Sequence, residues 1–351
     1  MKPAEKIKVG ISIGDLNGIG SEIALKTFED SRMLDFCTPV IFASAKLISF
    51  LNKTFKFDIK FQGIEDASQA VDGKVNVVNV WKETAPVHFG EEEAIAGEYA
   101  FKSLEAATNA LKENKIHVLV TAPINKHNIQ SEKFNFPGHT DYLAKELQGD
   151  SLMFMITPEA AGLKVGLLTD HVAVKDVATH ITPELIEKKI NIISKTLQQD
   201  FRISQPKIAV LGINPHSGDG GVIGKEDDEV MKPTLEKIRN SGKLVFGPYS
   251  ADSFFGSGNY KNFDAIVAAY HDQGLIPFKT LSFGHGVNFT AGLKKVRTSP
   301  DHGTAYEIAG KNKADHHSFK EAVFKAIDIF RNRIEYMELT KDVLKKQGKK
   351  I

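Results

Sequence analysis

The fold class follows from the segment Val118-Leu119-Val120-Thr121-Ala122-Pro123-Ile124-Asn125-Lys126. Its apolar, mostly β-branched start predicts a buried strand, and the proline- and asparagine-containing continuation predicts a loop that leaves the sheet. The same succession recurs along the chain. Further apolar runs that we predict as strands lie at residues 9–13, 40–43, 75–78, 165–168, 208–211 and 265–269.

Amphipathic stretches separate several of these strands. Residues 91–114 carry apolar side chains at helical spacing, residues 183–199 do the same, and residues 318–345 form a third predicted helix. Strands that alternate with helices predict an α/β fold with a largely parallel sheet. Because 351 residues exceed the usual size of one hydrophobic core, we expect two packed lobes with a cleft between them.

The composition is that of an ordinary soluble protein. With 25% charged residues and a formal net charge of +1, the chain has no basic excess, so we expect neither a nucleic-acid nor a membrane partner. No stretch of about 18 apolar residues occurs, and residues 1–8 mix lysine with glutamate, so we expect an unprocessed cytoplasmic protein. Cys37 is the only cysteine, and any metal must therefore be held by histidines and carboxylates.

Three of the twelve histidines follow predicted strands. His171 comes after residues 165–168, and His216 and His271 stand in the same relation to later strands. Ligands of open parallel sheets bind beyond the carboxyl ends of the strands, so these imidazoles predict a site for a zinc-like divalent ion with positions open for a substrate. The alternative is three unrelated polar histidines, because only folding can bring such distant residues together.

A second group of residues is suited to a phosphate. Lys279, Asn288 and Arg297 follow the last predicted strand, and His139 and Thr140 offer further donors. Arginine grips phosphate with paired hydrogen bonds, and lysine supplies a compact charge. A solvated basic loop is the alternative.

Two glycine-containing loops are candidates for contact with a nucleotide. GDLNGIGSE at residues 14–22 follows a predicted strand, but its spacing is not that of a dinucleotide-binding turn, so a plain strand-to-helix turn is the alternative. RTSPDHGTA at residues 297–305 leads into IAG at residues 308–310, where backbone N–H groups can meet a nucleotide. An ordinary loop is the alternative there.

Five segments together resemble the 4-hydroxythreonine-4-phosphate dehydrogenase family. They are GDLNGIGSE at 14–22, TAPINK at 121–126, FPGHTDYLA at 136–144, GINPHSGDGG at 212–221, and YHDQGLIPFK at 270–279 continuing through GVNFTAGLKKVRTSPDHGTA at 286–305. They occur in the family's order over nearly the whole chain. The family commonly has Pro-Ala where this chain has Leu16-Asn17 and proline at Ser21, and Ala291 and Lys294-Lys295 also differ, which concerns fine substrate specificity.

The resemblance implies a two-lobed α/β fold like that of isocitrate and isopropylmalate dehydrogenases, with a central cleft between the lobes. Residues 1–133 and 286–351 are then the first lobe, and residues 134–285 are the second lobe, with dimer and metal-site elements. The resemblance also implies a homodimer whose active site lies at the subunit interface.

The site residues implied by the resemblance fall into four groups. The metal ligands, two from one subunit and one from the other, are His171, His216 and His271. The substrate is held by His139, Thr140, Lys279, Asn288 and Arg297. NAD (or NADP) lies along Asp301, His302, Gly303, Thr304, Ala305 and Gly310. Asp252 and Asp272 are candidates for orienting a ligand or transferring a proton. The metal expected is zinc, with magnesium, cobalt or manganese as alternatives.

The implied reaction is the NAD-dependent oxidation of 4-phosphohydroxy-L-threonine and its decarboxylation to 3-amino-2-oxopropyl phosphate, a step in the biosynthesis of pyridoxal 5'-phosphate (vitamin B6). A bound dication favours both steps, because it acidifies the hydroxyl group and then polarises the ketone. The alternatives are a paralogous dehydrogenase of 4-phospho-erythronate or a similar phosphorylated hydroxy acid, a metal-dependent phosphohydrolase that uses no NAD, and a non-enzymatic phosphate-binding protein.

Overall fold

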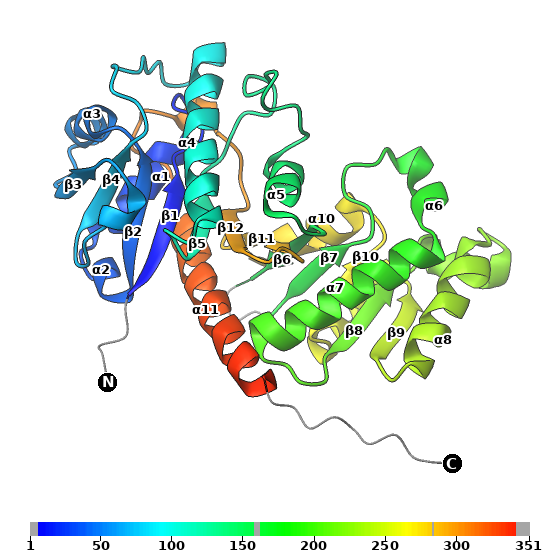
Figure 1. Cartoon of the computed structure of the whole chain (residues 1–351). Coiled ribbons are helices and arrows are strands. Elements are labelled where there is room, and N and C mark those ends of the chain that lie inside the picture. Colours follow the sequence, from blue (N-terminus) through cyan, green and yellow to red (C-terminus); the bar gives the residue numbers. More distant parts are fainter. Residues whose placement is uncertain (1–5, 158–161, 283, 342–351) are drawn as a thin grey trace.

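The computed structural model describes residues 6–157, 162–282 and 284–341, which form an α/β fold built on one large sheet (Figure 1). Its strands pair in the order β3-β4-β2-β1-β5-β12-β11-β6-β7-β10-β8-β9. The α/β class predicted from the sequence is therefore confirmed.

The first half of the sheet is entirely parallel. Its strands are β1 (Ile7–Ser12), β2 (Cys37–Ala43), β3 (Phe61–Ile64), β4 (Val75–Asn79), β5 (Val118–Thr121) and β12 (Val296–Pro300). The helices in this part are α1 (Gly20–Glu29), α2 (Met33–Phe36), α3 (Ala45–Phe55) and α4 (Ala94–Lys112). Although β12 comes late in the chain, it lies beside β5, with Arg297 opposite Leu119 and Thr298 opposite Val120.

An antiparallel section joins this half to a second parallel one. β12 pairs with β11 (Val287–Ala291), β11 with β6 (Leu152–Ile156), and β6 with β7 (Lys164–Leu167), each in antiparallel fashion. The parallel strands β10 (Ala265–Ala268), β8 (Lys207–Leu211) and β9 (Leu244–Tyr249) follow β7 across the sheet.

The remaining helices accompany this second half or span the junction. They are α5 (His139–Leu147), α6 (Val177–His180), α7 (Pro183–Phe201), α8 (Lys232–Asn240), α9 (Ala251–Gly256), α10 (His271–Ser282) and α11 (His317–Thr340). Short 3₁₀ turns occur at Ala67–Gln69, Val174–Asp176, Pro215–Gly221, Asn259–Asn262 and Tyr306–Ile308, and a π turn occurs at Asp227–Met231.

All the strands predicted from apolar runs are present, within a few residues of their expected bounds. The three predicted helices correspond to α4, α7 and α11, and the end of the third prediction, residues 342–345, lies outside the described residues. The sequence reading missed β3, β6, β9, β11 and β12. β12 reads VRTSP and looks polar, yet every one of its residues is buried. The division into lobes of residues 1–133 with 286–351 and of residues 134–285 stays a prediction, and the sheet continues across it.

The core lies on both faces of the sheet. In the first half, α4 covers one face through Leu104 and Leu111, which belong to the same apolar cluster as Val40 and Leu119. The opposite face is covered by α1, α3 and α11, whose cluster continues under α7 into the second half of the sheet. In the part of the chain that the structure describes, no helix is both long and apolar enough to cross a membrane.

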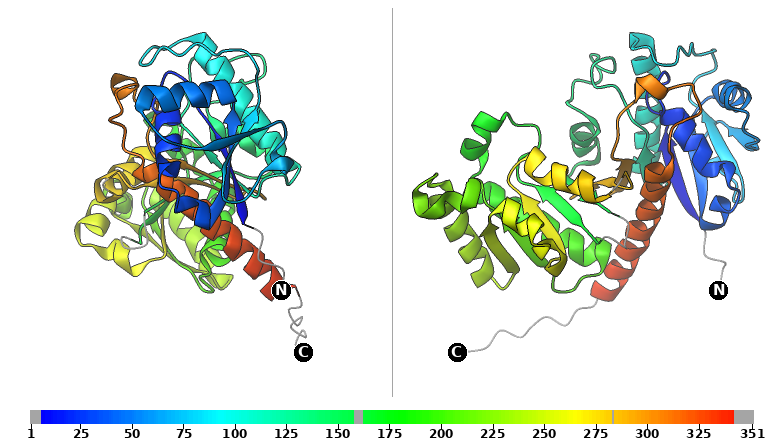
Figure 2. Two further views of the ribbon diagram at one scale, coloured as in Figure 1. Left: turned by 90° about the vertical axis from the view of Figure 1, so that its left-hand side faces the viewer. Right: turned by 180° about the vertical axis from the view of Figure 1, so that it is seen from behind.

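Helix α11 holds the two halves together. It contacts β1, β5, β12 and β11 as well as α1 and α7, and Figure 2 shows it running along the junction. The Arg333 side chain of α11 donates to Asp200 of α7, with Nε 2.6 Å from Oδ1 and Nη2 3.0 Å from Oδ2, and both residues are buried. Arg333 Nη1 also donates to the carbonyl of Leu293 at 3.0 Å. A paired, buried charge is therefore fixed between the last helix and the second half.

We expect Asp200→Asn to destabilise the protein by about 3 kcal/mol or more, because it leaves the Arg333 charge buried without a carboxylate. Glu335→Gln is the matched control, since Glu335 pairs with Arg202 between the same two helices but on the exposed surface, where an ion pair contributes about 0.5 kcal/mol or less. Urea unfolding followed by circular dichroism measures both shifts, and equal, small shifts would contradict the role of the buried pair.

Candidate active site

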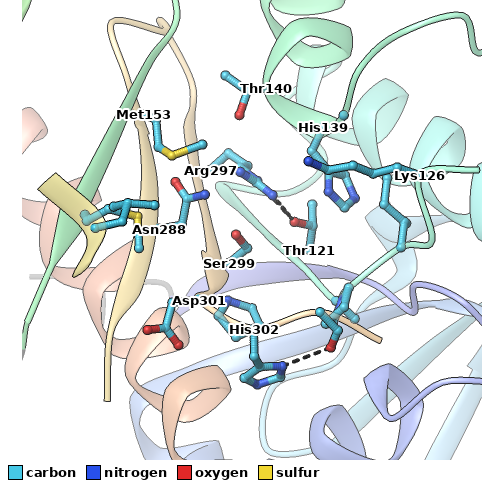
Figure 3. A pocket seen from close by; sticks show the side chains of 18 of the residues that line it. Thr121, Lys126, His139, Thr140, Met153, Asn288, Arg297, Ser299, Asp301 and His302 are labelled. Carbon is cyan, nitrogen blue, oxygen red and sulfur yellow. Dashed lines mark hydrogen bonds between the residues drawn. The ribbon is translucent and has the colours of Figure 1, made fainter. Parts of the chain in front are cut away.

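A cavity of about 300 Å³ lies where the two halves of the sheet meet (Figure 3). The end of β5 and the loop after it form one wall, β12, β11 and β6 form another, and the first turn of α5 and part of α10 complete it. The lining includes all five residues expected to bind the substrate: His139, Thr140, Lys279, Asn288 and Arg297. The structure brings these distant residues together, while their role in binding stays a prediction.

Arg297 carries a buried charge that no carboxylate balances. Its side chain is 2% exposed, and it donates from Nε to the Thr121 hydroxyl at 3.1 Å and from Nη1 to the Thr290 hydroxyl at 3.0 Å. Among the described residues it forms no ion pair. Burial lowers the pKa of the guanidinium to about 9, so the group is still charged at neutral pH. A buried cation whose only partners are neutral oxygens is a strong site for an anion.

Three further polar groups in this cavity have no partner within the described chain. They are the buried atoms His139 Nε2, Asn288 Oδ1 and His302 Nε2. Burial, together with the charges of Arg297 and Lys126, holds the pKa of His139 well below its usual range, so its imidazole is neutral. Because buried polar atoms are nearly always hydrogen-bonded in folded proteins, these atoms point to a ligand that supplies the missing partners.

Lysines add positive charge at the cavity surface. Lys279 Nζ lies 3.4 Å from the carbonyl oxygen of Asp301, and Lys126 Nζ lies 3.5 Å from His171 Nε2. The sequence reading assigned no role to Lys126, although it stands in the loop after β5. The histidines were selected because they lie just beyond the carboxyl ends of strands. Lys126 meets the same criterion.

Two of the three predicted metal ligands line this cavity. His171 follows β7, His271 begins α10, and their ring centroids are 6.4 Å apart. His271 Nδ1 lies 2.7 Å from the Asp272 carboxylate, which leaves its Nε2 available to a ligand. Imidazole nitrogens facing a cavity suit a zinc-like ion.

The third predicted ligand, His216, is not in the lining. It lies in the turn Pro215–Gly221 with φ 53°, in the left-handed region, and no close three-ligand set is formed by His171, His216 and His271 within one chain. Among the described residues, the sets of three ligand atoms within 4.8 Å of one another are Asp315, His316 and His317, and His88, Glu91 and Glu93, mostly on the exposed surface.

The two carboxylates considered for orientation or proton transfer line a different cavity, of about 790 Å³, with Tyr260, Tyr270 and Ile276. Asp272 contacts His271 from that side. The hydroxyl of Ser250, the backbone N–H of Ser253 and the charge of His216 lower the pKa of Asp252. Asp272 is thus placed to orient the His271 imidazole, and Asp252 lies close enough to His216 to interact with its charge.

The residues expected along the nucleotide divide into two groups. Asp301, His302 and Gly303 line the cavity, and His302 Nε2 is buried without a partner. Thr304, Ala305 and Gly310 lie outside the lining.

The loop at residues 14–22 packs tightly against this nucleotide segment. A Cβ on Gly18 would come within 2.9 Å of the Thr304 carbonyl oxygen, and Gly14, with φ +72°, would collide with the Pro123 carbonyl. The buried Asp15 accepts hydrogen bonds from Asn128 Nδ2 at 2.7 Å and from the Tyr306 hydroxyl at 3.0 Å. The glycines thus serve close packing, and Asp15 ties together the loops after β1, β5 and β12.

Comparisons with known proteins identify the family of this chain. Residues 35–326 match the family model described as pyridoxal phosphate biosynthetic protein PdxA. The chain is 47% identical over 342 residues to the 4-hydroxythreonine-4-phosphate dehydrogenase of Bacteroides thetaiotaomicron, covering 97% of this chain and 94% of the relative. It is 34% identical to the D-threonate 4-phosphate dehydrogenase of Cupriavidus necator, covering 93% and 98%.

A solved structure supports the same relationship. The crystal structure of 4-hydroxythreonine-4-phosphate dehydrogenase from Klebsiella pneumoniae superposes with a TM-score of 0.80 at 30% identity, covering 94% of this chain and 99% of that one. Fold and sequence thus agree over almost the full length, and the chain belongs to the PdxA family of pyridoxal phosphate biosynthetic proteins.

Proposed function

We propose that this protein is an NAD-dependent dehydrogenase that oxidises 4-phosphohydroxy-L-threonine and releases carbon dioxide to give 3-amino-2-oxopropyl phosphate. Hydride leaves the carbon that bears the hydroxyl group and passes to NAD⁺, the hydroxyl proton is released, and a proton replaces the carboxylate when carbon dioxide departs. The observation that carries the proposal is the buried, unbalanced charge of Arg297 in a cavity that is also lined by His171 and His271, two of the predicted metal ligands.

The phosphate end of the substrate is assigned to the Arg297 side of the cavity. Arg297 and Lys279 supply positive charge there, and Thr140 and the neutral His139 supply hydrogen bonds. Because its N–H groups are held by Thr121 and Thr290, the guanidinium is preorganised for an anion before the substrate arrives.

The hydroxyl end is assigned to the histidine side. When bound, a divalent cation supplies Lewis acidity to the hydroxyl and ketone oxygens, and NAD⁺ accepts the hydride. His171 and His271 would hold the cation, with Asp272 fixing the orientation of the His271 ring. Asp301, His302 and Gly303 line the cavity where the nucleotide would approach. Zinc is the metal proposed, because a set of three histidines with an open position is typical of catalytic zinc sites.

The cation site is proposed to be shared between two copies of the chain. One chain keeps His171 and His271 together but leaves His216 outside the cavity. A second copy that presents His216 would complete three imidazole ligands, in line with the homodimer that the sequence resemblance implies.

Oxidation of a phosphorylated acid without the amino group is the second candidate. Its support is the D-threonate 4-phosphate dehydrogenase relative, since Arg297, Lys279 and the histidines suit either substrate. Metal-dependent NADH formation by the purified protein, with 4-phosphohydroxy-L-threonine, D-threonate 4-phosphate and 4-phospho-erythronate compared side by side, tests the choice. Turnover of only the acids that lack the amino group would overturn the first proposal.

Replacement of Arg297 should chiefly affect substrate binding. We expect Arg297→Met to raise the KM for the phosphorylated substrate by about 100-fold, because charge-assisted hydrogen bonds to a phosphate are lost, with a much smaller change in the KM for NAD. Steady-state NADH formation gives both constants. A proportional rise in both would instead indicate general damage to the fold.

Loss of a cavity histidine should remove metal and turnover together. We expect His171→Ala to bind less than about a tenth of the wild-type divalent metal and to lose NADH formation. His317→Ala is the control, because His317 belongs to the exposed Asp315, His316 and His317 group away from the cavity lining. Metal analysis of the dialysed proteins checks this, and full activity of metal-free His171→Ala would refute the metal assignment.

A shared site predicts complementation between two inactive variants. His216→Ala and His171→Ala homodimers should each be nearly inactive, whereas co-expression should restore about a quarter of wild-type NADH formation, because half of the dimers are hybrids with one intact site. If each subunit carried a complete site of its own, the mixture would stay as inactive as its parts.

A further inference from the structure

Lys126 is a cavity cation that the proposed reaction has not yet used. Its ammonium nitrogen lies 3.5 Å from His171 Nε2, and no carboxylate pairs with it among the described residues. Figure 3 shows it beside His139, across the cavity from Asn288 and Asp301. It is one of three cationic side chains in the lining, with Lys279 and Arg297, against the carboxylates of Asp141 and Asp301.

The backbone that carries Lys126 is fixed, whereas its side chain is exposed. Asn125 Oδ1 accepts hydrogen bonds from the N–H groups of His127 and Asn128, and Gln130 Nε2 donates to the Lys126 carbonyl at 2.9 Å. The side chain can therefore change partners by rotation about its own bonds, without movement of the loop.

The position of this ammonium is incompatible with a cation on His171. A neutral imidazole nitrogen has one lone pair, which either accepts a hydrogen bond from the ammonium or binds a metal at about 2.0–2.1 Å. An ammonium left in place would also lie within a few ångströms of a dication and repel it. A cation on His171 Nε2 therefore requires Lys126 to turn away.

We propose that Lys126 is a positioning residue that exchanges partners. It holds His171 Nε2 when no divalent cation is bound, and once displaced it donates to an anionic oxygen of the substrate. This inference rests on the proposed function. Lys126 then links the two binding events, because binding of the cation frees the Lys126 ammonium to contact the substrate. The Lys126 side chain therefore weakens cation binding and strengthens substrate binding.

The test uses Co²⁺ as the probe, because its visible spectrum reports coordination by nitrogen. Co²⁺ is titrated into the metal-free, full-length protein at constant pH without substrate, and the affinity is measured by calorimetry and absorbance. All proteins carry His317→Ala, which removes a ligand of the exposed Asp315, His316 and His317 group. Lys126→Met is compared with Lys126→Arg and with Lys279→Met, which removes another cavity cation that contacts Asp301 instead of His171.

We expect Lys126→Met to bind Co²⁺ about tenfold more tightly than the parent, while its kcat/KM falls by about 10- to 100-fold with the Co²⁺-loaded enzyme. Lys126→Arg should restore much of the parent's kcat/KM, because it keeps the charge. Lys279→Met should lose substrate affinity with little gain in Co²⁺ affinity. A merely structural role for Lys126 would weaken both affinities together.

Two results would overturn the inference. One of them leaves the proposed function standing, and the other removes it as well. Unchanged or weaker Co²⁺ binding by Lys126→Met, beside a parent that binds Co²⁺ and forms NADH, would remove the role of Lys126 and leave the proposed function standing. A parent protein that neither binds Co²⁺ in the cavity nor forms NADH would remove both.

Discussion

The pairing of β12 with β5 is the contact on which the site depends. It sets Arg297 opposite Leu119 and brings its guanidinium to the Thr121 hydroxyl, where the loop that carries Lys126 begins. Because β12 is also one strand of a hairpin with β11, the same contact brings in Asn288 and, through β6, the second half of the sheet. The hydroxyls around Arg297 satisfy its N–H groups but not its charge. This uncompensated positive charge makes the junction between the two halves of the sheet a suitable binding site for an anion.

The parts of the fold that sequence could predict are those in which burial and residue type agree. The strand β10 is a continuous apolar run because both of its faces are covered, and α4 and α7 show clear helical periodicity. β12 was missed because its Arg297, Thr298 and Ser299 are buried polar residues. Their polarity belongs to the site and to packing against α11, where Thr298 Oγ1 donates to the Ala322 carbonyl. The departure from the strand pattern therefore coincides with the candidate site.

The site was predictable only in part for a related reason. Residue type and position after a strand singled out His171 and Arg297, but spacing alone could not decide between a phosphate site and a solvated loop, because the cavity residues come from seven separate segments. The resemblance to a known family supplied that choice. The resemblance implied that one of the three histidines comes from a second subunit, but not that His216 is the one outside the cavity of its own chain. Nothing in the sequence indicated that Lys126 lies against His171, since both facts depend on side-chain placement.

The place of the β11–β12 hairpin between β5 and β6 has a consequence for synthesis on the ribosome. β5 and β6 are translated well before residues 287–300, so each has an unpaired edge in the nascent chain until the hairpin has left the exit tunnel. Open strand edges recruit other strands, including those of neighbouring nascent chains. The β5 edge therefore stays open to mispairing while residues 122–295 are translated, which is about half of the chain.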